Sequence, residues 1–152
     1  MTKRFTLDTN ILVYSVDISN RGKHLRAVEL MTRAVGADCV LLRQSLAEFY
    51  HATTCKKLME RSDAANLIES WMEAFPTAGY GEKAFRAALE MAAKRASRLW
   101  DSLLIEAAKE ADCGYLLSED FQDGSRHGDV TVRNPFAGRS LPDDLVDALG
   151  LD

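Results

Sequence analysis

Four acidic residues of this chain lie where apolar runs begin or end, which is an unusual setting for a charged side chain. Asp8 and Asp120 follow short strand-like runs, and Glu48 and Asp101 open helix-like runs. Carboxylates are rarely buried unless they are paired or bound to metal. A fold that accommodates this chain must therefore either leave the four acids scattered on its surface or give them a common partner.

Short strand-like runs alternate with longer stretches of helical periodicity. Strands are predicted at residues 4–7, 39–42, 115–117 and 130–132. Helices are predicted at residues 24–35, 45–58, 62–75, 82–96, 100–111 and 143–149, with a first helical turn at 11–14. This alternation predicts an α/β fold in which a parallel sheet is flanked by helices. In such sheets, ligand-binding groups collect beyond the carboxyl ends of the strands.

Two helix starts are predicted from capping residues. Ser45 and Glu48 have the spacing of a capping box, in which each side chain bonds a backbone amide at the helix start. Ser62 is a candidate N-cap of the next helix. On this interpretation Glu48 and Asp101 both lie in first helical turns, from which they can face the edge where the acid-bearing strands end.

Each acid also has a purely structural explanation. Asp8 can cap a turn, and Glu48 can serve the capping box alone. Asp101 can be stabilised by the positive end of its helix, and Asp120 can be a loop acid. Together at one sheet edge, however, the four would raise one another's pKa unless a cation neutralised them. The set therefore favours a pocket for Mg²⁺ or Mn²⁺, which prefer carboxylate and water oxygens.

A cation held by carboxylates points to phosphodiester hydrolysis. It lowers the pKa of a water, orients that water toward phosphorus and stabilises charge on the leaving oxygen. The rival chemistry is phosphotransfer in a receiver-like or dehalogenase-like domain, which needs a nucleophilic Asp with a fixed Lys partner. Here the first acid begins Asp8-Thr9-Asn10 rather than an Asp-x-Asp start, and no Lys follows the later strand. Hydrolysis is the better match.

Four segments surround these acids in chain order: Leu7–Leu12, Leu46–Phe49, Trp100–Leu104 and Leu117–Gly124. They resemble the motifs of PIN-domain nucleases, and most of all those of VapC-type toxins of bacterial toxin–antitoxin pairs. The resemblance runs over nearly the whole chain. It implies a three-layer α/β/α domain with a short, mainly parallel central sheet. It also implies a Mg²⁺- or Mn²⁺-dependent endoribonuclease that acts on RNA, forms a homodimer and is inhibited by a small cognate antitoxin.

The resemblance also assigns roles by motif match. The implied catalytic, metal-site carboxylates are Asp8, Glu48, Asp101 and Asp120. Asp123 falls where some relatives carry an additional acid, so it is a further candidate metal ligand. The polar groups expected to orient these carboxylates or the substrate are Thr9, Asn10 and Ser118.

The charge distribution bears on whether the chain binds RNA. The net charge of −4 gives no global basic signature, and acids gather in the last third of the chain. A solvated acidic surface explains this, but so does an acidic site whose bound cations and local basic rim receive a polyanion. Arg43, Arg95 and Arg98 are the favoured phosphate contacts, because each lies close in sequence to a helix that carries a site acid.

The composition sets limits on organisation and location. The 152 residues, 47% hydrophobic and 28% charged, fit one domain over residues 1–152. We find no membrane-length apolar run and no signal-peptide pattern, and three separated cysteines indicate reduced thiols. These features predict a cytoplasmic protein.

A different class of function is a regulatory binding module that captures the antitoxin and serves operator regulation within a toxin–antitoxin complex, with hydrolysis incidental. The resemblance implies that the two middle helices form a hairpin that grips the antitoxin. These helices carry Trp71, Phe75, Phe85 and Met91, and an apolar groove there would suit an amphipathic partner helix. An internal core stripe explains most of these positions equally well.

Overall fold

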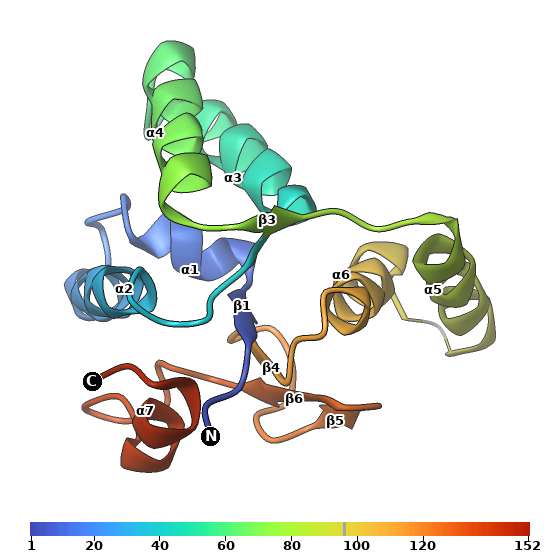
Figure 1. The fold of residues 1–152 in the computed structure, drawn as a ribbon. Helices are drawn as coiled ribbons and strands as arrows, with labels where there is room; N and C mark the ends of the chain where they lie inside the picture. The colour runs from blue at the N-terminus through green and yellow to red at the C-terminus, as the bar shows by residue number, and fades with distance from the viewer. Residues whose placement is uncertain (96) are drawn as a thin grey trace.

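A short, mainly parallel sheet forms the centre of the structure, a computed structural model that describes residues 1–95 and 97–152 (Figure 1). Its strands lie in the order β1-β4-β6-β5. They are β1 (Phe5–Leu7), β4 (Tyr115–Leu117), β5 (Arg126–His127) and β6 (Val130–Arg133). β1, β4 and β6 are parallel, whereas β5 runs antiparallel to β6. A second parallel pair, β2 (Leu41–Leu42) and β3 (Thr77–Ala78), adjoins β1 through a bridge between Phe5 and Cys39.

Helices cover both faces of this sheet. They are α1 (Thr9–Tyr14), α2 (Arg21–Ala34), α3 (Arg43–Cys55), α4 (Arg61–Ala74), α5 (Glu82–Arg95), α6 (Leu99–Glu110) and α7 (Asp143–Leu149). Successive side chains of a strand point to opposite faces, and two separate apolar clusters result. Phe5, Leu7 and Leu117 pack with α1, α2, α3 and α7. Leu116 and Val132 pack with α6 on the other face. The predicted three-layer α/β/α arrangement is confirmed.

The predicted start of α3 is wrong. The helix begins at Arg43, directly after β2, and its N-cap is Leu42, which makes no side-chain capping bond. Ser45 lies inside the helix, fully buried, and its hydroxyl has no hydrogen-bond partner in the described residues. Glu48 therefore sits in the second turn. Ser62 likewise lies inside α4 and is not its N-cap. Neither helix start is stabilised by a side-chain capping hydrogen bond.

The two middle helices do not form a hairpin with each other. α4 packs against α3, where the rings of Phe49 and Trp71 meet edge to face at 4.8 Å. α5 packs against α6, and Figure 1 shows α4 and α5 well apart, with β3 between them. Ala96, the last residue of the helix predicted at residues 82–96, lies outside the described residues. Within the described part of the chain, no helix is long and apolar enough to cross a membrane.

Candidate active-site cleft

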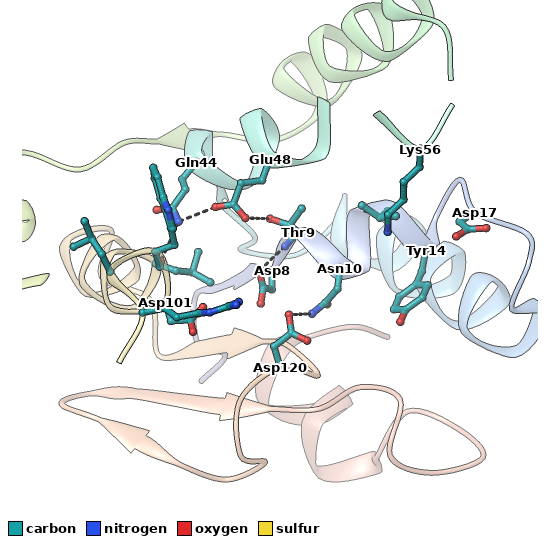
Figure 2. A pocket seen from close by; sticks show the side chains of 15 residues that line it. Asp8, Thr9, Asn10, Tyr14, Asp17, Gln44, Glu48, Lys56, Asp101 and Asp120 are labelled. Atoms are coloured by element: carbon teal, nitrogen blue, oxygen red, sulfur yellow. Dashed lines mark hydrogen bonds between the residues drawn. The ribbon is translucent and has the colours of Figure 1, made fainter. Parts of the chain in front are cut away.

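A cleft of about 870 Å³ opens where the parallel strands β1 and β4 end, and all four predicted acids line it. Asp8 follows β1 and is the N-cap of α1. Asp120 lies in the segment after β4, Asp101 in the first turn of α6 and Glu48 in the second turn of α3. Figure 2 shows the four carboxylates, from four separate elements, directed into the same space. The fold thus brings distant acids together as the strand-end argument predicts.

Asp8 is the buried member of this set, with 6% of its surface exposed. Its Oδ2 accepts a hydrogen bond from the hydroxyl of Ser118 at 2.6 Å, and its Oδ1 accepts one from the backbone amide of Thr9 at 2.6 Å. The pKa of Asp8 is raised to about 6, mainly by burial. The two hydrogen bonds lower this pKa, and the charges of Asp120 and Glu48 raise it. The site therefore holds a carboxylate that a positive charge would stabilise.

Glu48 is held by two donors. The hydroxyl of Thr9 donates to its Oε2 at 3.1 Å, and the amide of Gln44 donates to its Oε1 at 2.9 Å. The same amide donates to the backbone oxygen of Trp100 at 3.1 Å, so Gln44 joins α3 to α6 across the cleft. Gln44 was not among the site residues predicted from the sequence. Gln44 lies four residues before Glu48, so the two are neighbours on one face of the helix. A helix predicted to start at Arg43 would have included Gln44 and indicated this contact.

Asp120 and Asp101 complete the set. The amide of Asn10 donates to Oδ2 of Asp120 at 3.0 Å (Figure 2). The carboxylate of Asp101 accepts no hydrogen bond from the described residues. Burial raises the pKa of Asp101, Arg98 opposes this rise, and Asp120 and Glu48 add to it. The acids therefore act on one another electrostatically, and they outnumber the two cations that line the cleft, Lys56 and Arg98.

The cleft also offers neutral oxygen donors. Oδ1 of Asn10 and Oε1 of Gln44 are buried without a partner among the described residues, and both residues line the cleft. With the four carboxylates, they give an all-oxygen donor set of the type that Mg²⁺ and Mn²⁺ prefer. In residues 1–95 and 97–152, no three acidic, histidine or cysteine side chains converge tightly enough to enclose an ion. Because Mg²⁺ keeps several waters and binds directly through one or two carboxylates, these residues fit a hydrated cation.

A second cluster anchors the segment that carries Asp120. The hydroxyl of Tyr14, which lines the cleft, donates to Glu119. Lys23 donates to the other oxygen of Glu119 at 2.7 Å and lies 5.0 Å from the centre of the Tyr14 ring. These contacts tie the segment after β4 to α1 and α2. Tyr14 was not predicted as a site residue, although it lies four residues after Asn10 and on the same face of the helix.

Two predicted site residues lie away from the cleft. Asp123 is exposed, accepts a hydrogen bond from the backbone amide of Asn134 at 2.9 Å and lies 3.5 Å from the Nε of Arg133. These contacts give it a structural role. Arg43 donates to the hydroxyl of Thr77 at 3.2 Å, on β3, and does not line the cleft.

The other two predicted arginines lie nearer. Arg98 lines the cleft, and Arg95 lines a groove beside it. Asp17, Lys56 and Trp100 line the cleft as well. Trp100 is 63% exposed, which is unusual for so large an apolar side chain, so the mouth of the cleft presents an aromatic face to solvent.

This architecture can be compared with known proteins. The model of the PIN domain family matches residues 5–122, a span that includes all four acids of the cleft. The chain belongs to the PIN domain family. Among curated proteins, none matches it in sequence.

Solved structures share the fold of this PIN domain at low identity. VapBC2 from Rickettsia felis, bound to a DNA fragment from its promoter, matches with a TM-score of 0.62 and 13% identity over 86% of this chain and 98% of that one. VapC20 from Mycobacterium tuberculosis, described as a toxin that cleaves the sarcin-ricin loop, matches with a TM-score of 0.62 and 10% identity over 76% and 91%. DNA-bound VapBC from Salmonella typhimurium gives 0.60 and 16% over 88% and 98%.

Proposed function

We propose that this PIN domain is a Mg²⁺- or Mn²⁺-dependent endoribonuclease, the toxin of a toxin–antitoxin pair. The observation that carries the proposal is the cleft that Asp8, Glu48, Asp101 and Asp120 line together from four elements. Like charges gathered around a buried carboxylate destabilise a fold unless a cation compensates them. A protein that keeps this arrangement gains from the cation in its chemistry.

The residues of the cleft divide the work. Asp8 and Asp101 would hold the cation, with Glu48 and Asp120 completing its surroundings. A bound Mg²⁺ or Mn²⁺ would supply an activated water and neutralise charge on the leaving oxygen. Ser118 and Thr9 fix the orientation of Asp8 through their hydrogen bonds. Asn10 does the same for Asp120.

The family and its structural relatives support the biological setting that we propose. Structural relatives include VapBC complexes and a toxin described as cleaving the sarcin-ricin loop. By this likeness we assign RNA as the substrate, a small cognate antitoxin as the inhibitor and a homodimer as the working form. We place the enzyme in the cytoplasm, where RNA is available to it.

Cleavage of RNA by purified protein tests the proposal. We expect cleavage with Mg²⁺ or Mn²⁺, loss of cleavage with EDTA, and loss of at least a thousandfold in Asp8→Asn. The control is Asp123→Asn, which removes the same charge from an exposed acid outside the cleft and should cleave at a rate close to that of the unaltered protein. Full activity of Asp8→Asn, in protein that melts normally, would reject the assignment.

One observation favours the second candidate, a binding module with incidental hydrolysis. A mainly apolar groove beside the cleft, between α3 and α6, is lined by Ala47, Ala52, Tyr80 and Trp100, together with Thr9, Gln44, Glu48 and His51. It could receive an apolar segment of an antitoxin. Co-expression with the small protein encoded by a neighbouring gene tests this. Tight binding by a protein that cleaves no RNA with any divalent metal would favour the module over the enzyme.

A further inference from the structure

A cleft lined by carboxylates repels RNA, so an enzyme of this kind needs positive charge nearby. A second groove of about 680 Å³ adjoins the cleft, and the two share Arg98 and Asp101 as lining residues. It lies between α5, α6 and the β5 hairpin, on the side of the molecule where Figure 1 shows these elements together. We call this second space the basic groove, and its residues are Met91, Arg95, Ser97, Arg98, Asp101, Ser102, Ile105, Glu106, Lys109, Phe121, Arg126, His127 and Gly128.

Cations outnumber acids in the basic groove. Its four cationic side chains are Arg95, Arg98, Lys109 and Arg126, against two acids. One of these acids, Glu106, is already paired with Lys109 at 2.9 Å. The three arginines are exposed and make no salt bridge within the part of the chain that the structure describes. Three guanidinium groups are therefore free to contact an anion, although the chain as a whole is acidic.

Aromatic groups lie among these cations. The rings of Phe121 and His127 meet edge to face with their centres 6.2 Å apart. His127 is held by Ser125, whose hydroxyl lies 3.2 Å from Nε2. Grooves that combine cations along a backbone path with aromatic rings are typical of sites for single-stranded nucleic acid. The composition thus matches a flexible polyanion with flat bases better than a small anion.

We propose that the basic groove binds the sugar–phosphate backbone of single-stranded RNA on one side of the scissile bond. This inference rests on the proposed nuclease function. The strand passes Arg98 at the boundary with the cleft, and Arg95 and Arg126 contact the next phosphates. Phosphate contacts position a strand without reading its sequence, so the groove sets affinity and register and leaves sequence choice to other contacts. Arg43, which begins α3 and is bonded to Thr77 of β3, has no part in this path.

Binding of RNA by a cleavage-silent protein tests the groove. In the Asp8→Asn background, the change Arg95→Ala with Arg126→Ala should weaken binding of a fluorescently labelled 12-nucleotide single-stranded RNA at least tenfold. The slope of log affinity against log salt should fall by about 1.4, the value for two lost phosphate contacts on a single strand. The matched control is Arg61→Ala with Arg139→Ala, two exposed arginines that line neither space. We expect its affinity and slope to be unchanged.

Cleavage kinetics separate failure of the groove from failure of the function. With Asp8 intact, Arg95→Ala with Arg126→Ala should raise KM and leave kcat nearly unchanged, because the lost contacts lie away from the reacting atoms. If the unaltered protein cleaves RNA and the groove variant matches its control in KM and salt slope, only the groove proposal is overturned. If the unaltered protein neither cleaves nor binds RNA, both proposals fall. Loss of binding to a polyglutamate peptide, with RNA binding intact, would assign the groove to an acidic protein segment instead.

Discussion

At the scale of single residues, Asp8 concentrates the chemistry of the site. It is buried at the end of β1 in a cleft that other carboxylates line, and its own carboxylate accepts two hydrogen bonds from the described residues. Its pKa of about 6 means that the folded protein holds a proton there which an unfolded chain would release at lower pH. Without a cation, the ionised carboxylate is therefore a local cost to stability.

This cost predicts that Asp8→Asn stabilises the metal-free protein. Both states hold the proton of Asp8 well below pH 3.8, so the variant should then match the unaltered protein. Between pH 4 and 6 the unfolded chain ionises first and the unaltered protein loses stability as pH rises. Above pH 6 the full penalty is present, up to about 3 kcal/mol for the difference between 3.8 and about 6. Urea unfolding in EDTA across this pH range measures the difference in free energy of unfolding between Asp8→Asn and the unaltered protein. We expect this difference to grow in favour of the variant from pH 4 to pH 8, and a difference that shrinks or reverses would contradict the prediction.

The positions of some site residues could be predicted from the sequence, and those of others could not. Asp8 and Asp120 could be placed at one edge because parallel strands end there. Asp101 could be placed there because a helix start points back at that edge. Glu48 reaches the cleft from a second turn, so its predicted capping box was the wrong reason for its place. Asp120 and Asp123 belong to the same segment after β4, but only Asp120 lines the cleft. The turn of this segment separates them, and nothing in the local sequence specifies that turn.

At the scale of elements, α3 is positioned by its packing on α4. Phe49 is fully buried and its ring meets that of Trp71, while the next residue, Tyr50, is exposed. Phe49→Ala should lower the free energy of unfolding by about 3–5 kcal/mol, the usual cost of removing a buried phenylalanine side chain. Tyr50→Ala, the matched exposed change, should cost less than about 1 kcal/mol. Urea titration measures both, and equal losses would show that α3 is not held by this contact.

The segment after β4 is an element without regular structure, and the Tyr14–Glu119–Lys23 cluster holds it. Tyr14→Phe removes the hydroxyl that donates to Glu119. We expect a loss of about 1.5–3 kcal/mol, the range for a hydrogen bond to a charged group, and slower cleavage because Asp120 is less firmly placed. Tyr80→Phe, on an exposed tyrosine, is the control. Unchanged stability and cleavage rate in Tyr14→Phe would show that this cluster does not hold the segment after β4.

Regular elements could be predicted where their patterns are long. The helices of α2, α5 and α6 have many turns, and their existence follows from periodicity. β3 and β5 have two residues each, too few for an alternating pattern to appear. The start of α3 was missed because β2 leads into it without a loop, which leaves no polar residue to mark the boundary.

At the scale of the whole molecule, acids dominate the net charge while cations gather in the basic groove. Binding of a divalent cation to the cleft should stabilise the folded state alone. The expected gain is about 2.7 kcal/mol when the free cation is at 100 times its dissociation constant. Thermal unfolding with increasing Mn²⁺ should therefore show a rising Tm for the unaltered protein and for Asp123→Asn. Asp8→Asn should show little change, and an equal rise in all three proteins would mean that Mn²⁺ binds elsewhere.

The central claim is that these four carboxylates form one site for a divalent cation. Anomalous diffraction from crystals of the protein grown with Mn²⁺ tests it most directly. We predict an anomalous peak inside the cleft, within ligand distance of a carboxylate oxygen of Asp8 or Asp101. A cleft without a peak at saturating Mn²⁺, or a peak only at acids outside the cleft, would contradict the claim.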